Sequence, residues 1–174
     1  NIENYLAAIA AVDGMVSDEI IRDFARTFGG VEHRIELIRT LDGVRWYNDS
    51  IASSPSRTIA GLRSFPEKVV LIAGGKDKGI SYDSLGPVVN DHVKLLILCG
   101  ATAGVIRRAV EQAPNYAGLE ILDVADYEEA AALARSRTQP GDVVILSPAS
   151  TSFDRFANFM ERGRVFKDVV NRLQ

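Results

Sequence analysis

From residue 56 onwards, short apolar runs alternate with segments that have the pattern of amphipathic helices. The apolar runs are predicted strands: Val69 to Ala73, Lys94 to Cys99, Glu120 to Leu122 and Val143 to Leu146. The predicted helices are Ser56 to Ser64, Ser84 to Asn90, Ala103 to Ala113, Tyr127 to Thr138 and Asp154 to Leu173. Strands that are apolar along their whole length are buried on both faces, which is typical of parallel sheets. The pattern predicts a Rossmann-like α/β fold with a mostly parallel sheet and helices on both faces.

The segment before this alternation contains helices and then a hairpin. Helices are predicted over about Ile2 to Val12 and Ser17 to Thr27, and the pair Gly29-Gly30 ends the second one. Two β-rich runs then flank Asp42-Gly43, a dipeptide that favours a two-residue hairpin turn. We therefore expect two domains, residues 1–30 and 31–174, and the second is expected to begin with an antiparallel hairpin.

Composition excludes several classes of protein. The chain has 174 residues, of which 47% are hydrophobic and 25% are charged, as in ordinary globular domains. A net charge of -3 leaves no basic footprint for nucleic acid. The single cysteine, Cys99, lies in an apolar run and is expected in the core, which fits a reducing cytoplasm. His33 and His92 are too few and too far apart in sequence to suggest a metal site.

No apolar run approaches the ~20 residues that a membrane span needs. The first residue is Asn rather than Met, so we expect a fragment or a processed chain from which targeting signals could have been removed. We therefore expect a cytoplasmic protein without a membrane partner.

Ser147 to Asp154 is the polar segment that says most about function. It follows a predicted strand, and four of the six residues from Ser147 to Ser152 carry hydroxyl groups. Ligands of open α/β sheets bind beyond the carboxyl ends of strands, where hydroxyls and a helix N-terminus can bind an anionic or polar group. The alternative is structural: Pro148 makes a turn and a Ser or Asp caps the helix.

Two further strand ends carry polar loops. Asp49 follows the run Val44 to Asn48 and could accept hydrogen bonds from ribose hydroxyls, or it could be a turn residue before an N-cap at Ser54. The loop Gly74 to Gly79 contains two lysines that could meet a carboxylate or phosphate, or it could be a solvated turn. It is not a P-loop, because G-x-x-x-x-G-K-[ST] is absent from the sequence. Three polar loops at one sheet edge are expected to converge on one crevice.

Together these loops resemble the C-terminal domain of the Mur ligases. The matching segments are Asn48 to Ser53, Ala73 to Lys78, Gly141 to Ala149 and Ser152 to Gly163. Asn1 to Asn4 resembles the end of the motif that closes the family's central ATPase domain, and His33-Arg34 resembles the junction between the two domains. Within the family, the motifs are most similar to the members that add D-glutamate to UDP-N-acetylmuramoyl-L-alanine.

The resemblance implies an ATP-dependent carboxylate–amine ligase of peptidoglycan synthesis. In that reaction ATP phosphorylates the UDP-N-acetylmuramoyl-L-alanine carboxylate, and the amine of D-glutamate attacks the acyl phosphate. The resemblance assigns five residues to D-glutamate: Ser53, Lys78, Ser152, Phe153 and Phe159, the last as an apolar wall. It assigns four to ATP: Arg34 as a catalytic residue at the phosphates, Asp49 at the ribose, and Asn1 and Asn4 near the adenine.

The resemblance also implies that much of the enzyme precedes residue 1. The P-loop, the Mg²⁺ ligands and the UDP-binding domain belong there, so residues 1–30 are a remnant of the central domain and the fragment is expected to be inactive alone. The full-length enzyme is expected to be a monomer, whereas the fragment is expected to be able to self-associate. No metal ligand is predicted in this chain.

Two positions depart from the family pattern, and two other functions compete. Ile51 stands where some members carry Lys, and Ser53 stands where Thr is common.

The folylpolyglutamate synthases share the architecture but carry Asp-x-Ala-His-Asn-Pro at the first loop, and the segment Asp49 to Pro55 has no His. A non-catalytic nucleotide-binding module is the other alternative, against which a P-loop upstream in the same reading frame would argue.

Overall fold

The computed structural model describes residues 2–174 and contains two compact units, Asn1–Val31 and Glu32–Gln174. The first unit holds α1 (Ile2–Ala11) and α2 (Asp18–Thr27). Ser17 stands at the N-cap of α2 as expected, although its side chain makes no capping hydrogen bond. Within this unit the ring of Phe28 stacks on Phe24 at 5.1 Å and meets Tyr5 edge-on at 6.4 Å.

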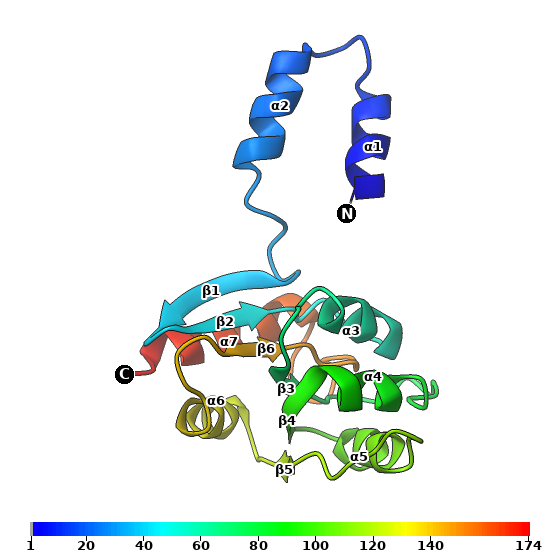
Figure 1. Ribbon diagram of the computed structural model, residues 1–174, viewed down its shortest axis with the longest axis vertical. Coiled ribbons are helices and arrows are strands. Elements are labelled where there is room, and N and C mark those ends of the chain that lie inside the picture. The colour runs from blue at the N-terminus through cyan, green and yellow to red at the C-terminus, as the bar shows by residue number, and fades with distance from the viewer. Residues whose placement is uncertain (1) are drawn as a thin grey trace. The chain divides into compact units, whose positions relative to one another are not determined.

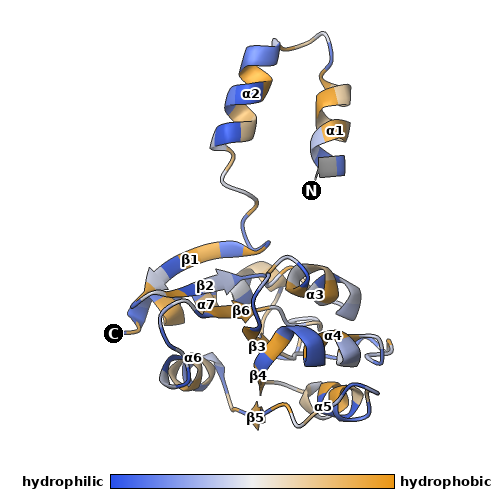
Figure 2. Cartoon of the chain, viewed as in Figure 1, coloured by the Kyte–Doolittle hydropathy of each residue, from blue (hydrophilic) through white to orange (hydrophobic). Residues whose placement is uncertain are grey.

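The first unit leaves much of its apolar surface uncovered. Its exposed large hydrophobic side chains include Leu6, Met15, Val16, Ile20, Phe24 and Val31. Both Ile20 and Phe24 on α2 are 58% exposed, and no residue of that helix is buried. Figure 2 shows the corresponding hydrophobic colour on both helices. Many exposed apolar side chains on two short helices favour contact with another protein surface.

We expect the chain to self-associate through α2. Its apparent mass in sedimentation equilibrium should rise with protein concentration, because association removes the apolar face from water. The double variant Ile20→Lys/Phe24→Lys should shift the chain toward monomer, since it places two charges on that face. Thr27→Lys, at an exposed polar position of the same helix, is the matched control. A parent chain that stays monomeric at every concentration would contradict the expectation.

The second unit is built on one six-stranded sheet with the order β1-β2-β6-β3-β4-β5. The strands are β1 (Glu36–Leu41), β2 (Val44–Asn48), β3 (Val69–Ala73), β4 (Val93–Leu98), β5 (Ile121–Asp123) and β6 (Val143–Leu146). All neighbouring pairs are parallel except β1 and β2, which form an antiparallel hairpin. Asp42 and Gly43 connect them with φ angles of 49° and 79°, as a type I′ turn requires.

Helices cover both faces of the sheet. They are α3 (Pro55–Leu62), α4 (Leu85–His92), α5 (Ala103–Glu111), α6 (Tyr127–Ser136) and α7 (Phe159–Arg172). On one face, α3, α4 and α5 pack on strand residues such as Leu71 and Leu96, and on the other, α6 and α7 pack on their neighbours Val70 and Ile97. Figure 1 shows the two helix layers with the sheet between them. The Rossmann-like α/β prediction is confirmed, with helix and strand ends shifted by a few residues.

The last helix begins later than predicted, at Phe159 instead of Asp154. Its start is fixed by Asn158, whose side-chain oxygen accepts the backbone N–H of Glu161 at 2.9 Å. The Glu161 carboxylate in turn accepts the N–H of Ala157 at 2.8 Å. Asn158 is thus the N-cap, and the interpretation that a Ser or Asp caps this helix is wrong. The Glu161 N–H at this helix end is therefore bonded within the protein, to the Asn158 side chain.

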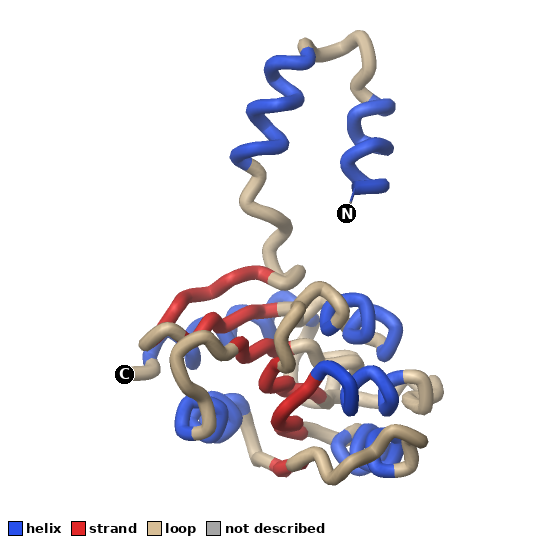
Figure 3. Tube along the Cα trace, in the orientation of Figure 1, coloured by secondary structure: helices blue, strands red, loops and turns tan. Residues whose placement is uncertain are grey.

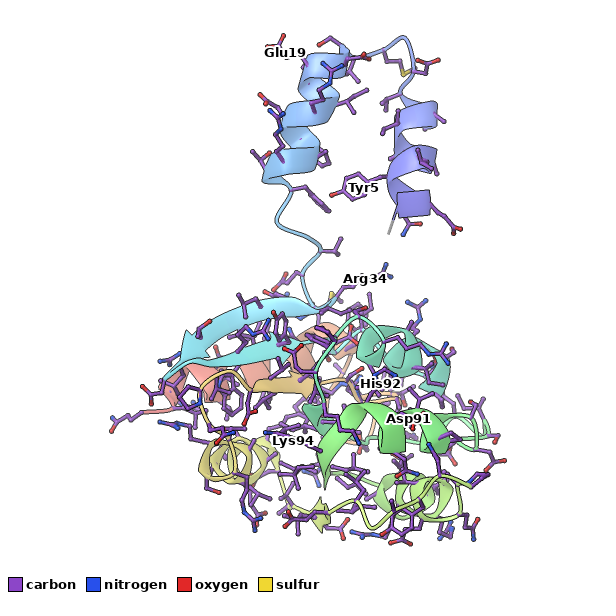
Figure 4. The ribbon with its side chains drawn as sticks, viewed as in Figure 1. Tyr5, Glu19, Arg34, Asp91, His92 and Lys94 are labelled. Carbon is purple, nitrogen blue, oxygen red and sulfur yellow. The ribbon has the colours of Figure 1, made fainter. Side chains whose placement is uncertain are left out.

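Cys99 lies in the core as predicted, 6% exposed. His92 ends α4, where Figure 4 labels it beside Asp91, whereas His33 lies in the segment before β1. Within residues 2–174, no helix combines the length and apolar character needed to cross a lipid bilayer.

Candidate functional site

The predicted polar loops leave the sheet at a topological switch point. Strand β6 lies between β2 and β3, and it runs parallel to both. The chain leaves β2 and β3 toward α3 and α4 on one face, but it leaves β6 toward α7 on the other. Figure 3 shows these connecting loops at the strand ends. Neighbouring strands whose chains diverge in this way open a crevice at their carboxyl ends, which is where open α/β sheets bind ligands.

The loops after β3 and β6 are joined by backbone hydrogen bonds. The N–H of Gly74 donates to the carbonyl of Pro148 at 2.9 Å. Lys76 and Thr151 form an antiparallel bridge, with N···O distances of 2.9 and 3.1 Å. The Thr151 hydroxyl also donates to the Lys76 carbonyl at 2.9 Å. The loops after β3 and β6 are therefore packed together, and the hydrogen bond from Ser147 to Asp49 joins the loop after β2 to them.

Most hydroxyls of the Ser147 segment hold the protein together. The Ser147 hydroxyl donates to the Asp49 carboxylate at 2.8 Å, and Ser150 shares hydrogen bonds with Tyr82 at 2.9 Å and Thr102 at 2.8 Å. Ser147 and Ser150 are at most 1% exposed. The interpretation that these two hydroxyls meet a ligand is wrong, because they are buried and already bonded. Ser152, the one assigned to D-glutamate, is 2% exposed.

The two glycines after β3 approach protein backbone rather than open solvent. Gly74 and Gly75 have φ angles of 117° and 150°, in the region that favours glycine. A Cβ on Gly74 would lie 2.0 Å from the carbonyl oxygen of Cys99, and one on Gly75 would lie 2.2 Å from that of Thr151. The glycines thus allow three strand-end loops to pack against each other.

Asp49 is a buried acceptor at the centre of this arrangement. It is 3% exposed, and its Oδ1 accepts the backbone N–H of Ile35 at 3.3 Å while Oδ2 accepts the Ser147 hydroxyl. Its carbonyl accepts the N–H of Ala52, so it is also the predicted turn residue. Burial raises the pKa of the Asp49 carboxyl from its ordinary value of 3.8 to about 6, although hydrogen bonds from Ser147 and Ile35 oppose the shift.

We expect the contribution of Asp49 to stability to fall as the pH rises from about 4 to 6. In that window the folded state binds the Asp49 proton more tightly than the unfolded state, so the free energy of unfolding falls until both states are ionised. The upper limit is roughly 3 kcal/mol, from about 1.4 kcal/mol per pKa unit. Asp49→Asn keeps an acceptor for Ile35 and should remove this slope.

The measurement is urea unfolding of the chain at several pH values between 4 and 7. Asp77→Asn, at an exposed position in the loop after β3, serves as the control and should keep the parental slope. Equal slopes for the parent and Asp49→Asn would show that Asp49 titrates normally.

The residues assigned to D-glutamate come from all three loops. The ammonium of Lys78 lies 3.4 Å from the Ser53 hydroxyl, so the first two loops meet at these side chains. Lys78 is exposed, and Phe153 is 62% exposed. The ring of Phe159 is half-buried and meets His33 edge-on at 5.9 Å. Lys78 and Phe153 are therefore open to solvent, whereas Ser53 and Phe159 are only partly so.

Arg34 stands between two residues with unusual backbone angles. His33 and Ile35 have φ angles of 66° and 46°, and a β-branched residue in that region is strained. His33 is buried and bonded to Asn48, and the Ile35 N–H is bonded to Asp49, so both flanks are fixed. Arg34 itself is exposed, and Figure 4 shows it in the segment before β1.

His33 also belongs to a group of potential metal ligands with Glu32 and Glu36. The Lys167 ammonium already lies 3.0 Å from Glu32 and 2.7 Å from Glu36. The Asn48 side chain accepts the N–H of Ser50, so its NH₂ group faces His33 Nδ1 and leaves the imidazole proton on Nε2. A protonated Nε2 and a neighbouring ammonium do not suit Mg²⁺, which prefers oxygen ligands in octahedral geometry.

The ATP residues that the resemblance assigns are divided between the units. Asn4 lies on α1 in the first unit, whereas Arg34 and Asp49 lie in the second. Asn1 lies outside the described residues. The roles of these residues, and those of the D-glutamate residues, stay predictions.

Two hollows lie farther along the same sheet edge. One of about 490 Å³ is lined by residues that include Ala101, Asp123 and Asp154, and one of about 240 Å³ by residues that include Cys99, Tyr127 and Asp154. Neither is lined by a residue assigned to D-glutamate or ATP.

Arg162 is a residue of this region to which the sequence pattern gave no role. It is 1% exposed, and it donates to the Ser50 hydroxyl, the Ser50 carbonyl and the Ser150 carbonyl at 2.9 to 3.0 Å. One sequence signal was available: Arg162 occupies the stripe of α7 that also buries Phe166 and Val170, at helical spacing. A charged residue on an apolar stripe indicates a buried polar contact.

Comparisons with known proteins agree with the predicted resemblance. A family model described as "Mur ligase, glutamate ligase domain" matches residues 33–150. The chain is 54% identical, over its whole length, to the UDP-N-acetylmuramoylalanine–D-glutamate ligase of Acetivibrio thermocellus, and 53% identical to that of Ruminiclostridium cellulolyticum. It spans 38% of the length of these curated relatives.

Solved structures with the same fold are more distant in sequence. The UDP-N-acetylmuramate-alanine ligase of Thermotoga maritima matches 97% of this chain with a TM-score of 0.70 at 15% identity, and the match covers 37% of that protein. The bifunctional folylpolyglutamate synthase/dihydrofolate synthase of Yersinia pestis matches 88% with a TM-score of 0.63 at 17% identity, covering 34% of that protein. These two matches establish the fold alone.

Proposed function

The chain belongs to the Mur ligase family, and we propose that it is the C-terminal, amino-acid-binding part of an ATP-dependent ligase that adds D-glutamate to UDP-N-acetylmuramoyl-L-alanine. The observation that carries the proposal is the 3.4 Å approach of the Lys78 ammonium to the Ser53 hydroxyl, between the loops that follow β3 and β2, in a chain about half identical to D-glutamate ligases. On this proposal, residues 1–30 are the end of the central ATPase domain.

The geometry suits an acidic amino acid. A dicarboxylate needs donors, and charge-assisted hydrogen bonds are the strongest that a side chain can supply. Lys78 offers an exposed ammonium beside the Ser53 hydroxyl. Phe159, which follows Ser152 closely in the sequence, offers an apolar wall. Phe153, which is largely exposed, completes the proposed set.

Arg34 is proposed to stabilise charge that develops at the phosphates during transfer. A guanidinium acts most strongly when it needs little reorganisation in the transition state, and the bonds of His33 and Ile35 hold the backbone that carries Arg34. Asp49 is proposed to serve the ATP side as well. Both carboxylate oxygens of Asp49 accept hydrogen bonds from the protein. One of these bonds holds the Ile35 backbone beside Arg34, and this contact is the geometric support for a role of Asp49 on the ATP side.

ATP and Mg²⁺ are proposed cofactors of the longer protein. A solved Mur ligase from Thermotoga maritima is described in complex with ADP, which supports a nucleotide in this family. The Glu32, His33 and Glu36 group does not fit Mg²⁺, so we place the metal ligands in the part of the protein outside this chain. We also propose a cytoplasmic location and a monomeric full-length enzyme.

The folylpolyglutamate synthases are the competing proposal within the same architecture. Their fold matches this chain, so fold does not separate the two functions. The first loop does, because Asp49 to Pro55 lacks the expected His, and the relatives named above favour D-glutamate.

The test is amide formation by the full-length enzyme and its Lys78→Ala variant. We expect the Michaelis constant for D-glutamate to rise about 10- to 100-fold, because loss of a charge-assisted contact costs roughly 1.5–3 kcal/mol. The Michaelis constant for ATP should change far less. Lys68→Ala, which removes an exposed lysine bonded to the carbonyl of Asn90, is the matched control. Parental D-glutamate kinetics in Lys78→Ala would remove Lys78 from the site.

A further inference from the structure

Arg162 joins the loops that carry the proposed D-glutamate residues. Its Nε donates to the Ser50 hydroxyl at 3.0 Å, and one terminal nitrogen donates to the Ser50 carbonyl at 2.9 Å. The other terminal nitrogen donates to the Ser150 carbonyl at 3.0 Å. Ser50 is three residues from Ser53, and Ser150 is two residues from Ser152. One rigid guanidinium therefore fixes the distance between two loops that contribute ligand donors.

The same side chain reaches the other two parts of the site. The Ser50 hydroxyl, which accepts from Arg162, donates to the carbonyl of Phe159 at 2.7 Å. On the glycine loop, a Cβ built on Gly75 would lie 3.1 Å from a terminal nitrogen of Arg162, so that backbone packs directly against the guanidinium. Arg162 thus contacts, directly or through Ser50, all the segments that carry Ser53, Ser152, Phe159 and Lys78.

Packing does not account for a guanidinium at this position. Burial disfavours the charged form, which lowers the pKa of Arg162, and charge on Asp154 opposes that shift. The three acceptors are neutral, and Arg162 takes part in none of the ion pairs found among residues 2–174. An apolar side chain would fill the α7 stripe without this cost, but it could not bond both loops.

We propose that Arg162 is a positioning residue for the acidic amino acid, because its planar fork sets the separation between the Ser53 and Ser152 loops. The proposal rests on the proposed function. Arg162 does not touch the substrate; it acts through Ser50 and the carbonyl of Ser150. Lysine has the charge but not the fork, so Arg162→Lys separates positioning from charge.

The experiment measures steady-state kinetics of the full-length ligase with Arg162→Lys and Ser50→Ala, together with thermal melts. Arg162→Lys is expected to raise the Michaelis constant for D-glutamate at least 10-fold while that for ATP stays within about twofold. Ser50→Ala removes the relay to Phe159 and should raise it about 3- to 10-fold. Arg164→Lys, at an exposed position of the same helix, is the matched control and should behave as the parent.

The outcomes separate this proposal from the proposed function. A parent enzyme that forms no amide with D-glutamate overturns the function, and this inference with it. A parent that does so, with parental Michaelis constants in a folded Arg162→Lys, overturns only the positioning role. A lowered melting temperature with unchanged kinetics also overturns it, since that is the signature of stability alone. If Arg162→Lys does not fold, Ser50→Ala decides the question by the same criterion.

Discussion

Gly74→Ala is expected to leave the chain unfolded or aggregated. The backbone at Gly74 has a φ of 117°, which disfavours any side chain, and an added Cβ would lie 2.0 Å from the carbonyl oxygen of Cys99. That oxygen belongs to backbone at the end of β4, so no side-chain rotation relieves the contact. We expect a loss of at least ~4 kcal/mol, in the range reached when backbone strain and overpacking act together.

Gly79→Ala provides the matched control for this effect. Gly79 lies in the same loop with a φ of 70°, but a Cβ there would meet nothing within 4 Å. Its cost should therefore be limited to backbone strain, about 1–2 kcal/mol. Urea unfolding of the two single variants, each compared with the parent chain, measures the difference between their losses of stability. Equal losses would mean that the approach of Gly74 to Cys99 does not constrain the fold.

The fold could be predicted because its signals are local. The runs Val69 to Ala73 and Val143 to Leu146 are apolar without interruption and too short for helices, so they indicate strands buried on both faces. The dipeptide Asp42-Gly43 favours a type I′ turn, and both residues have the positive φ that this turn requires. The predicted start of α7 was too early because Ser152 and Asp154 are also residue types that favour the N-cap. The hydrogen bonds that the side chains of Asn158 and Glu161 accept place the N-cap at Asn158 instead.

The site was harder to predict because several of its polar side chains hydrogen-bond to one another. Ser147 and Ser150 look like ligand donors in sequence, yet their partners are Asp49, Tyr82 and Thr102, which lie far away in the chain. Only the packed structure shows which hydroxyls are already bonded. Arg162 shows the reverse: a charged residue in a helix reads as surface until its stripe is found to face the core.

Arg34→Ala in the full-length enzyme is expected to lower kcat about 100- to 1000-fold with little change in the Michaelis constants. A group that stabilises charge mainly in the transition state contributes roughly 3–4 kcal/mol there and little to ground-state binding. Arg34→Lys should recover part of the loss, because it restores the charge without the planar fork. Arg63→Ala, which removes an exposed arginine at the end of α3, is the matched control.

The strain beside Arg34 makes the test specific to its side chain. His33 and Ile35 keep their positive φ angles through bonds to Asn48 and Asp49, none of which involves the Arg34 guanidinium. Truncation at Arg34 should thus leave the melting temperature near the parental value while turnover falls. A folded Arg34→Ala that turns over at the parental rate would show that Arg34 has no role at the phosphates. A parallel fall in melting temperature and turnover would instead make it a structural residue of the segment before β1.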